Sequence, residues 1–179
     1  MSEMSIDDIY AANDAARESF IQMVGSLSND ELNAELDGEK WPIVHVVEHV
    51  AMVEEGMSKI CAKLLREAQA AGAGANGTQT VSENYTSRSR EIVNMKLEAP
   101  ERVRPSGEKP VAESLAKMEV NRAKLEDIRP MFEAYDSQSF KFPHPFFGDL
   151  SAIEWLTLIG EHEKRHLKQI ESLLEKIRQ

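Results

Sequence analysis

The sequence has very little cysteine and no long apolar run. Cys61 is the only cysteine in 179 residues, so the chain can form neither an internal disulfide nor a cysteine-based metal cluster. Because Cys61 lies in the apolar helical context MSKICAKLL, we expect a buried, unreactive thiol. No stretch approaches the roughly 18 consecutive apolar residues of a membrane span, and the acidic start MSEMSIDDIYAAND does not resemble a secretory signal. We therefore expect a cytoplasmic protein without a membrane partner.

Positive charge is also scarce, with 21 Lys and Arg against 31 Asp and Glu, a net charge of −10. Such a chain would repel the phosphate backbone of nucleic acid unless a basic patch were segregated. The basic cluster of Lys164, Arg165 and Lys168 lies in a glutamate-rich segment. We interpret it as a solvated face, with Arg165 in a surface salt bridge. No nucleic-acid partner is expected, and the length suits one domain over residues 1–179.

Four long segments carry apolar residues at helical spacing. The predicted helices are 5–26, 42–71, 111–133 and 152–178. Ser5 with Asp8, and Ser151 with Glu154, predict capping boxes at two of the helix starts, and Pro42 suits the first turn of another. With no convincing strand, the pattern predicts an all-α four-helix bundle with one long crossover connection, and at most two short strands.

The segments between these helices are less regular. Residues 72–80, GAGANGTQT, are predicted to be a flexible loop. Residues 81–110 include EAPERVRPSGEKP, whose three prolines exclude one continuous helix. So long a connection is unusual in a compact domain, and we expect it to cover the bundle or to shape a site entrance. Before the last helix, FKFPHPFFGD is predicted to be an aromatic loop.

Two histidines interrupt the apolar stripe of the last predicted helix. The stripe consists of Trp155, Ile159, His162, His166, Ile170, Leu173 and Ile177. Burying two imidazoles one turn apart costs free energy unless each finds a partner. Because residues i and i+4 are neighbours on one helix face, His162 and His166 can both bind one metal ion.

The second predicted helix repeats the arrangement with His45 and His49. His49 falls within the stripe between Val46 and Val50, whereas His45 lies one turn earlier and about 40° to one side. A single core histidine is usually structural, hydrogen-bonded to a carbonyl or a carboxylate. Two such pairs on the core faces of two helices are harder to explain in that way. The spacing thus favours a metal site without excluding the structural alternative.

The run HEKRH also matches the H-E-x-x-H pattern of zinc proteases, in which Glu163 would be the general base. The extended protease pattern would need glycine at position 169 and histidine at position 172, where this chain has Gln169 and Ser172. Few residues follow His166, so the usual downstream glutamate ligand has no helix to come from. We therefore regard a protease as the weaker alternative.

The histidine segments resemble the DinB/YfiT-like superfamily of metalloenzymes. In that family a tryptophan opens the second helix and a histidine follows eight positions later, as Trp41 and His49 do within WPIVHVVEHVAMVEE. Its last helix carries an H-x-x-x-H pair, as in HEKRHLKQI, and HPFFGDLSAIEWL resembles the approach to that helix. The similarity covers most of the chain, and the two histidine segments are its most specific part.

The resemblance implies a four-helix bundle in which His49, His162 and His166 bind one divalent metal ion, usually nickel or zinc. It also implies a homodimer. Pro42 stands where the family has Ser or Thr, which changes the helix cap but not the ligand. His45 stands where the family commonly has Glu or Gln, and it could be a fourth ligand or an outer group. The sequence leaves that choice open.

Characterised relatives in that superfamily use small intracellular thiols, such as bacillithiol or mycothiol, in transfer or isomerisation reactions. A three-histidine site leaves positions for a thiolate or for water. We therefore expect a metal-dependent enzyme that transfers a low-molecular-weight thiol to a small electrophile. A metal-dependent hydrolase and a non-catalytic metal-binding stress-response module remain as alternatives.

Other candidate residues have weaker signals. Glu48 could be a base or a partner of His49, but we expect a solvent-exposed glutamate. His144 lies between two prolines and is not expected to be a ligand, and Trp41 is expected to anchor the start of the second helix. The loop phenylalanines could form an apolar wall for an electrophile or simply pack at the bundle end: Phe140, Phe142, Phe146 and Phe147.

Overall fold

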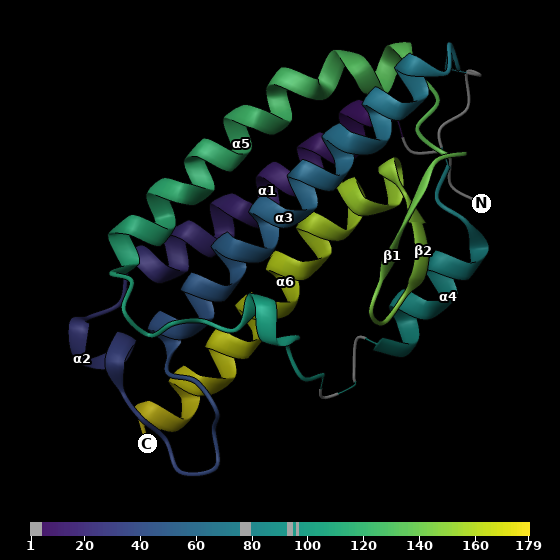
Figure 1. Cartoon of the computed structure of the whole chain (residues 1–179). Coiled ribbons are helices and arrows are strands. Elements are labelled where there is room, and N and C mark those ends of the chain that lie inside the picture. Colours follow the sequence, from purple (N-terminus) through teal and green to yellow (C-terminus); the bar gives the residue numbers. More distant parts are fainter. Residues whose placement is uncertain (1–4, 76–79, 93–94, 96) are drawn as a thin grey trace.

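Four long helices form a bundle in the computed structural model, which describes residues 5–75, 80–92, 95 and 97–179. They are α1 (Ile6–Gly25), α3 (Ile43–Ala70), α5 (Val111–Ala134) and α6 (Ala152–Ile177). In Figure 1, α1 and α3 lie between α5 and α6, and α3 contacts both α5 and α6. The predicted all-α bundle is confirmed. The predicted and observed ends of the four long helices differ by at most one residue.

Shorter elements connect and flank the bundle. They are α2 (Asn29–Asn33), α4 (Glu83–Ile92), the 3₁₀ turn η1 (Glu101–Val103), β1 (Lys141–His144) and β2 (Gly148–Ser151). β1 and β2 pair as an antiparallel hairpin, with Phe142 opposite Leu150, where an aromatic loop was expected. Figure 1 shows this hairpin and α4 on the side of the molecule away from α5. Much of the predicted loop 72–80 lies outside the described residues.

The helix starts follow from local hydrogen bonding. Glu154 accepts from the Ser151 N–H at 2.9 Å, and Asp8 accepts from the Ser5 N–H at 3.0 Å. Both predicted capping boxes are therefore present, and they satisfy amides that a helix start would leave without partners. Pro42 is the residue just before α3 rather than in its first turn.

The bundle core has two apolar clusters, and the site described below lies beside both. One cluster includes Leu64, Phe132 and Trp155, and the other includes Val50 and Ile170. Cys61 is fully buried, and burial raises its pKa, so the predicted unreactive thiol is consistent with its surroundings. Among the described helices, none combines the length and the apolarity that crossing a bilayer requires.

Candidate metal centre

Three histidines from two helices meet beside the bundle core. α3 contributes His49, and α6 contributes His162 and His166 from successive turns. The ring centroids are 4.4 Å apart for His162 and His166, 4.9 Å for His49 and His166, and 5.3 Å for His49 and His162. One nitrogen from each ring lies within 4.8 Å of the others, an arrangement that could hold a metal ion. His49 and His166 are buried, whereas His162 is partly exposed.

Acceptors behind two of these rings determine which nitrogen is available to an ion. Nδ1 of His49 lies 2.7 Å from the carbonyl oxygen of Val103, and Nδ1 of His166 lies 2.7 Å from Oε1 of Gln169. Because these oxygens only accept, each Nδ1 carries the hydrogen and donates it. The Nε2 lone pair of each neutral ring is then available. Metal-binding histidines are characteristically held in this way.

The separation of the two α6 rings also fits a shared ion. Nε2 of His162 and Nε2 of His166 are 3.1 Å apart. Two nitrogens that are each about 2.1 Å from one ion would be roughly 3.0–3.4 Å apart, for ligand angles from a right angle to the tetrahedral angle. Without an ion, the same spacing lets the two neutral rings share one hydrogen. The donor set therefore fits a divalent ion.

Burial keeps all three rings in the neutral form. Burial lowers the pKa of His49, and it lowers that of His166 to about 3, with a further contribution from the charge of His49. The pKa of His162 is held well below its ordinary value by burial first and then by the charge of His166. Because only neutral imidazole binds a metal, the three side chains are in their ligand form at neutral pH.

On α3, His45 lies one helical turn before His49 and Glu48 directly precedes it. Both lie against the connection, which we define as the described residues within 72–110. His45 is outside the three-histidine group; a Cβ placed on Gly107 would be 2.8 Å from Nε2 of His45. Glu48 is only 4% exposed and accepts hydrogen bonds from the Ser106 N–H, the Ser106 hydroxyl and the Gly107 N–H. The expected solvent-exposed Glu48 is therefore wrong, because the connection folds back over α3 and brings backbone donors to the carboxylate.

Glu163, the proposed base of the protease alternative, points into the bundle. It is 1% exposed, and its Oε1 lies 3.1 Å from Nη2 of Arg17 on α1. Arg17 also pairs with Glu54 of α3. The structure thus gives Glu163 a partner inside the bundle, and Glu163 does not line the pocket that contains the histidines. This placement argues against a zinc-protease reading of HEKRH.

Arg165 holds the connection against α6. Its guanidinium donates to the carbonyl oxygens of Ile92, at 2.8 Å, and of Met95, at 2.5 Å. Where a surface salt bridge was expected, Arg165 thus donates to backbone carbonyls at the last residue of α4 and just beyond it. Since these two carbonyls lie at and beyond the end of a short helix that was not predicted, helical spacing alone could not have indicated them.

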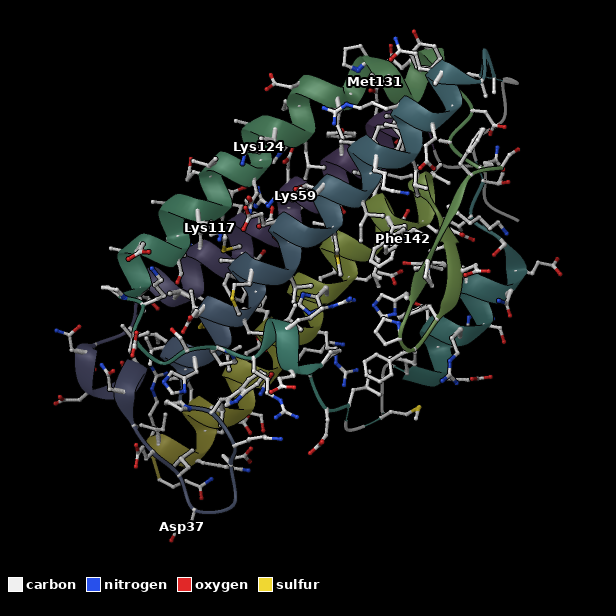
Figure 2. The ribbon with its side chains drawn as sticks, in the orientation of Figure 1. Asp37, Lys59, Lys117, Lys124, Met131 and Phe142 are labelled. Atoms are coloured by element: carbon white, nitrogen blue, oxygen red, sulfur yellow. The ribbon has the colours of Figure 1, made fainter. Side chains whose placement is uncertain are left out.

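A pocket of about 2370 Å³ opens over the histidines. Its lining includes His49, His162 and His166, together with parts of the connection and of the hairpin. Five rings on one side, which we call the aromatic wall, are Phe142, His144, Phe146, Phe147 and Trp155. Figure 2 labels Phe142 on the hairpin, beside the bundle. Three of the four loop phenylalanines thus line the pocket. All four, including Phe140, also belong to or pack against the core.

Two further rings stand near the histidines. The Trp41 ring centroid lies 5.1 Å from that of His49, so this side chain packs on a candidate ligand as well as standing at the start of α3. His144 contacts Trp155, with a centroid separation of 5.1 Å. It is not part of the three-histidine group, and sequence reasoning gave it no role.

Comparison with known proteins identifies the family of the chain. The model of the DinB superfamily matches residues 12–170. The chain belongs to the DinB superfamily. This DinB-superfamily chain is 26% identical over 167 residues to the uncharacterized protein YuaE of Bacillus subtilis (strain 168), a match that covers 92% of this chain and 96% of that protein.

A solved structure shows the same fold for this DinB-superfamily chain. It is the crystal structure of TT2238, a four-helix bundle protein, with a TM-score of 0.60 and 24% sequence identity. The match covers 94% of this chain and 99% of TT2238. At this identity the similarity concerns the fold alone.

Proposed function

We propose that this DinB-superfamily chain is a divalent-metal-dependent enzyme that transfers a low-molecular-weight thiol to a small electrophile. His49, His162 and His166 would be the metal ligands, with nickel or zinc as the ion. The observation that carries the proposal is the meeting of three neutral imidazoles at an open pocket. An ion held by three uncharged ligands keeps its full positive charge, which favours the thiolate form of a nearby thiol.

The size and lining of the pocket support two co-substrates. Its volume of about 2370 Å³ exceeds the roughly 300–1,000 Å³ of a typical single-ligand site. The aromatic wall offers an apolar surface to an organic electrophile. In a chain with a net charge of −10, the pocket lining has eight Lys and Arg against five Glu, a local excess of positive charge that would attract an anionic thiol. The cationic residues are Lys40, Lys59, Arg90, Arg102, Lys117, Lys164, Arg165 and Lys168.

The test begins with metal analysis of protein purified without a polyhistidine tag. Metal-loaded protein is then screened for conjugation of small thiols to small electrophiles. We expect a rate above that of the metal-free protein, and we expect chelation or His162→Ala to abolish it. His45→Ala is the matched control, because His45 is a partly buried histidine outside the three-histidine group.

The alternatives give different outcomes in the same assays. Thiol-independent hydrolysis of an ester or amide, without thiol conjugation, would replace the transferase with a hydrolase. Metal binding with no turnover in either assay would leave a non-catalytic metal-binding module. Absence of bound metal after loading would contradict all three.

A further inference from the structure

His144 ends β1 and lies in the pocket beside the three-histidine group without belonging to it. Three aromatic side chains surround its ring, with centroid separations of 5.0 Å to Phe147, 5.1 Å to Trp155 and 5.9 Å to Phe146. The pocket lining includes both His144 and His162. The surrounding rings hold His144 in one orientation in the aromatic wall.

A backbone hydrogen bond fixes the tautomer of His144. The Phe146 N–H donates to Nδ1 of His144, with 3.1 Å between the two nitrogens. A nitrogen that accepts such a bond cannot itself carry a hydrogen, so the neutral ring has its hydrogen on Nε2. Burial, with a further contribution from the charge of Arg102, lowers the pKa of His144 to about 4. At neutral pH the ring is therefore uncharged, with Nε2–H as its only donor.

This donor has no partner within the part of the chain that the structure describes. Among the described residues, the ring of His144 has one hydrogen bond, in which its Nδ1 accepts from the Phe146 N–H. Nε2 is not among the buried polar atoms that lack a partner, so it is open to the pocket. A fixed donor in an otherwise apolar wall is the kind of group that orients a ligand by a single acceptor atom.

We propose that His144 binds a carbonyl oxygen of the electrophilic substrate through its Nε2–H. The substrate class is thereby narrowed to electrophiles that carry a carbonyl group and an apolar body. The body lies on the aromatic wall, and the carbonyl oxygen accepts from His144. That the carbonyl compound is a substrate rests on the proposed thiol transfer. Its binding to His144 does not require turnover.

The test compares two ligands of matched shape, cyclohexanone and methylenecyclohexane, of which only the first has a carbonyl oxygen. Protein labelled with ¹⁵N in its histidine rings is titrated with each, in zinc-loaded and metal-free forms, and observed by NMR. We expect a His144 spectrum typical of the Nε2–H tautomer. Cyclohexanone should shift its Nε2 resonance saturably, and methylenecyclohexane should leave it unchanged. An Nδ1–H tautomer, an equal response to both ligands, or no saturable shift would overturn the proposal.

Two variants separate the donor from the ring. His144→Phe keeps an aromatic ring against Trp155 and removes the donor, so the affinity for cyclohexanone should fall about fivefold, as for the loss of one neutral hydrogen bond. His144→Gln places an amide N–H at a similar distance and should recover part of that affinity. Zinc content should be unchanged in both. Unaltered affinity in His144→Phe would refute the role, and if that variant failed to fold, the wild-type titrations would still decide.

The experiments distinguish failure of the His144 proposal from failure of the proposed thiol transfer. If no thiol is transferred to any electrophile while cyclohexanone still shifts the His144 resonance, the transferase is wrong and the carbonyl site stands. If thiol transfer is found and His144→Phe slows conjugation to 2-cyclohexen-1-one and to benzyl chloride equally, His144 has no role in recognising the carbonyl.

Discussion

At the scale of single residues, the bundle interior contains an unbalanced set of charges. Arg17, Glu54 and Glu163 are 7%, 2% and 1% exposed, and one guanidinium faces two carboxylates. Oε2 of each glutamate lacks a hydrogen-bond partner among the described residues. Burial raises the pKa of Glu163 to about 7, although the charge of Arg17 opposes the shift. Removing one partner of a buried pair is usually costly, but here a second carboxylate remains for Arg17.

Glu163→Gln should therefore become more stable relative to wild type as pH rises. The Glu163 carboxyl binds a proton more tightly in the folded state than in the unfolded state, where its pKa is near 4.5. The contribution of Glu163 to wild-type stability is consequently lost as pH rises from about 4.5 through about 7. At pH 8 we expect the free energy of unfolding of the variant to exceed that of wild type by about 1–3 kcal/mol.

Urea unfolding of metal-free protein at pH 5 and pH 8 measures this difference. Glu171→Gln, at an exposed position of the same helix, is the control and should follow wild type. If the stability of Glu163→Gln changed between pH 5 and pH 8 by the same amount as that of wild type, the assignment would be contradicted.

The two histidines of α3 should differ in their effect on metal affinity. His49→Ala, like His162→Ala and His166→Ala, removes a nitrogen from the three-histidine group and should weaken metal binding by at least about 100-fold. His45→Ala removes no nitrogen from this group and should weaken metal binding by less than about tenfold, below the roughly 10–100-fold effect of removing a group that supports a ligand. Competition with a chromogenic chelator gives the affinities. Equal losses in His45→Ala and His49→Ala would mean that the α3 ligand is misassigned.

The residues of the site were predictable to different degrees. His49, His162 and His166 lie on core-facing stripes, so helical spacing and the family resemblance predicted that they would meet, and the structure brings them together. Their binding of an ion stays a prediction. The surroundings of Glu48 and Arg165 were not predictable, because their partners lie on the connection. Spacing within a helix carries no information about the path of such a segment.

At the scale of elements, the long helices were predictable and the short ones were not. Long stripes and capping boxes determine where α1 and α6 begin. The ten-residue α4 is mostly polar, with only Tyr85 and Ile92 buried, and is too short to be stable alone. It is held by tertiary contacts, including Tyr85 stacked on Phe147 and Arg88 donating to the Phe146 carbonyl. The hairpin contains two prolines, which ordinarily argue against a strand.

Helix α3 should influence metal affinity through its contact with the connection. Glu48 holds the backbone of Ser106 and Gly107, and the preceding turn supplies the Val103 carbonyl to which His49 donates. In Glu48→Ala this support is lost, so the His49 ring is less well oriented. We expect about a tenfold loss of metal affinity, measured by chelator competition.

The matched control is Glu67→Ala on the same helix, which breaks an exposed ion pair with Lys63. It should leave metal affinity at the wild-type value. If Glu48→Ala also kept the wild-type affinity, the contact between α3 and the connection would have no part in orienting His49.

At the scale of the whole molecule, the family resemblance predicts a homodimer. In the described part of the chain, the large exposed apolar side chains are Met95 and Val120, which are 43% and 52% exposed. We therefore expect a contact of mixed polar and apolar character rather than an extended hydrophobic one. Sedimentation equilibrium at tens of micromolar protein should give twice the chain mass. A chain that sediments as a monomer at that concentration would contradict the prediction.

The connection touches both helices that carry the candidate ligands. The Val103 carbonyl accepts from His49 of α3, and the Ile92 carbonyl accepts from Arg165 of α6. Ordering of the connection and metal binding by the three-histidine group would therefore be thermodynamically coupled. Such coupling is reciprocal, so each would favour the other. An ion bound by the three-histidine group would therefore slow transient opening of the connection, and a compound that stabilises the connection in its observed position would raise the affinity for the ion. We therefore expect the exchange of amide hydrogens in the connection to slow when the protein is loaded with metal.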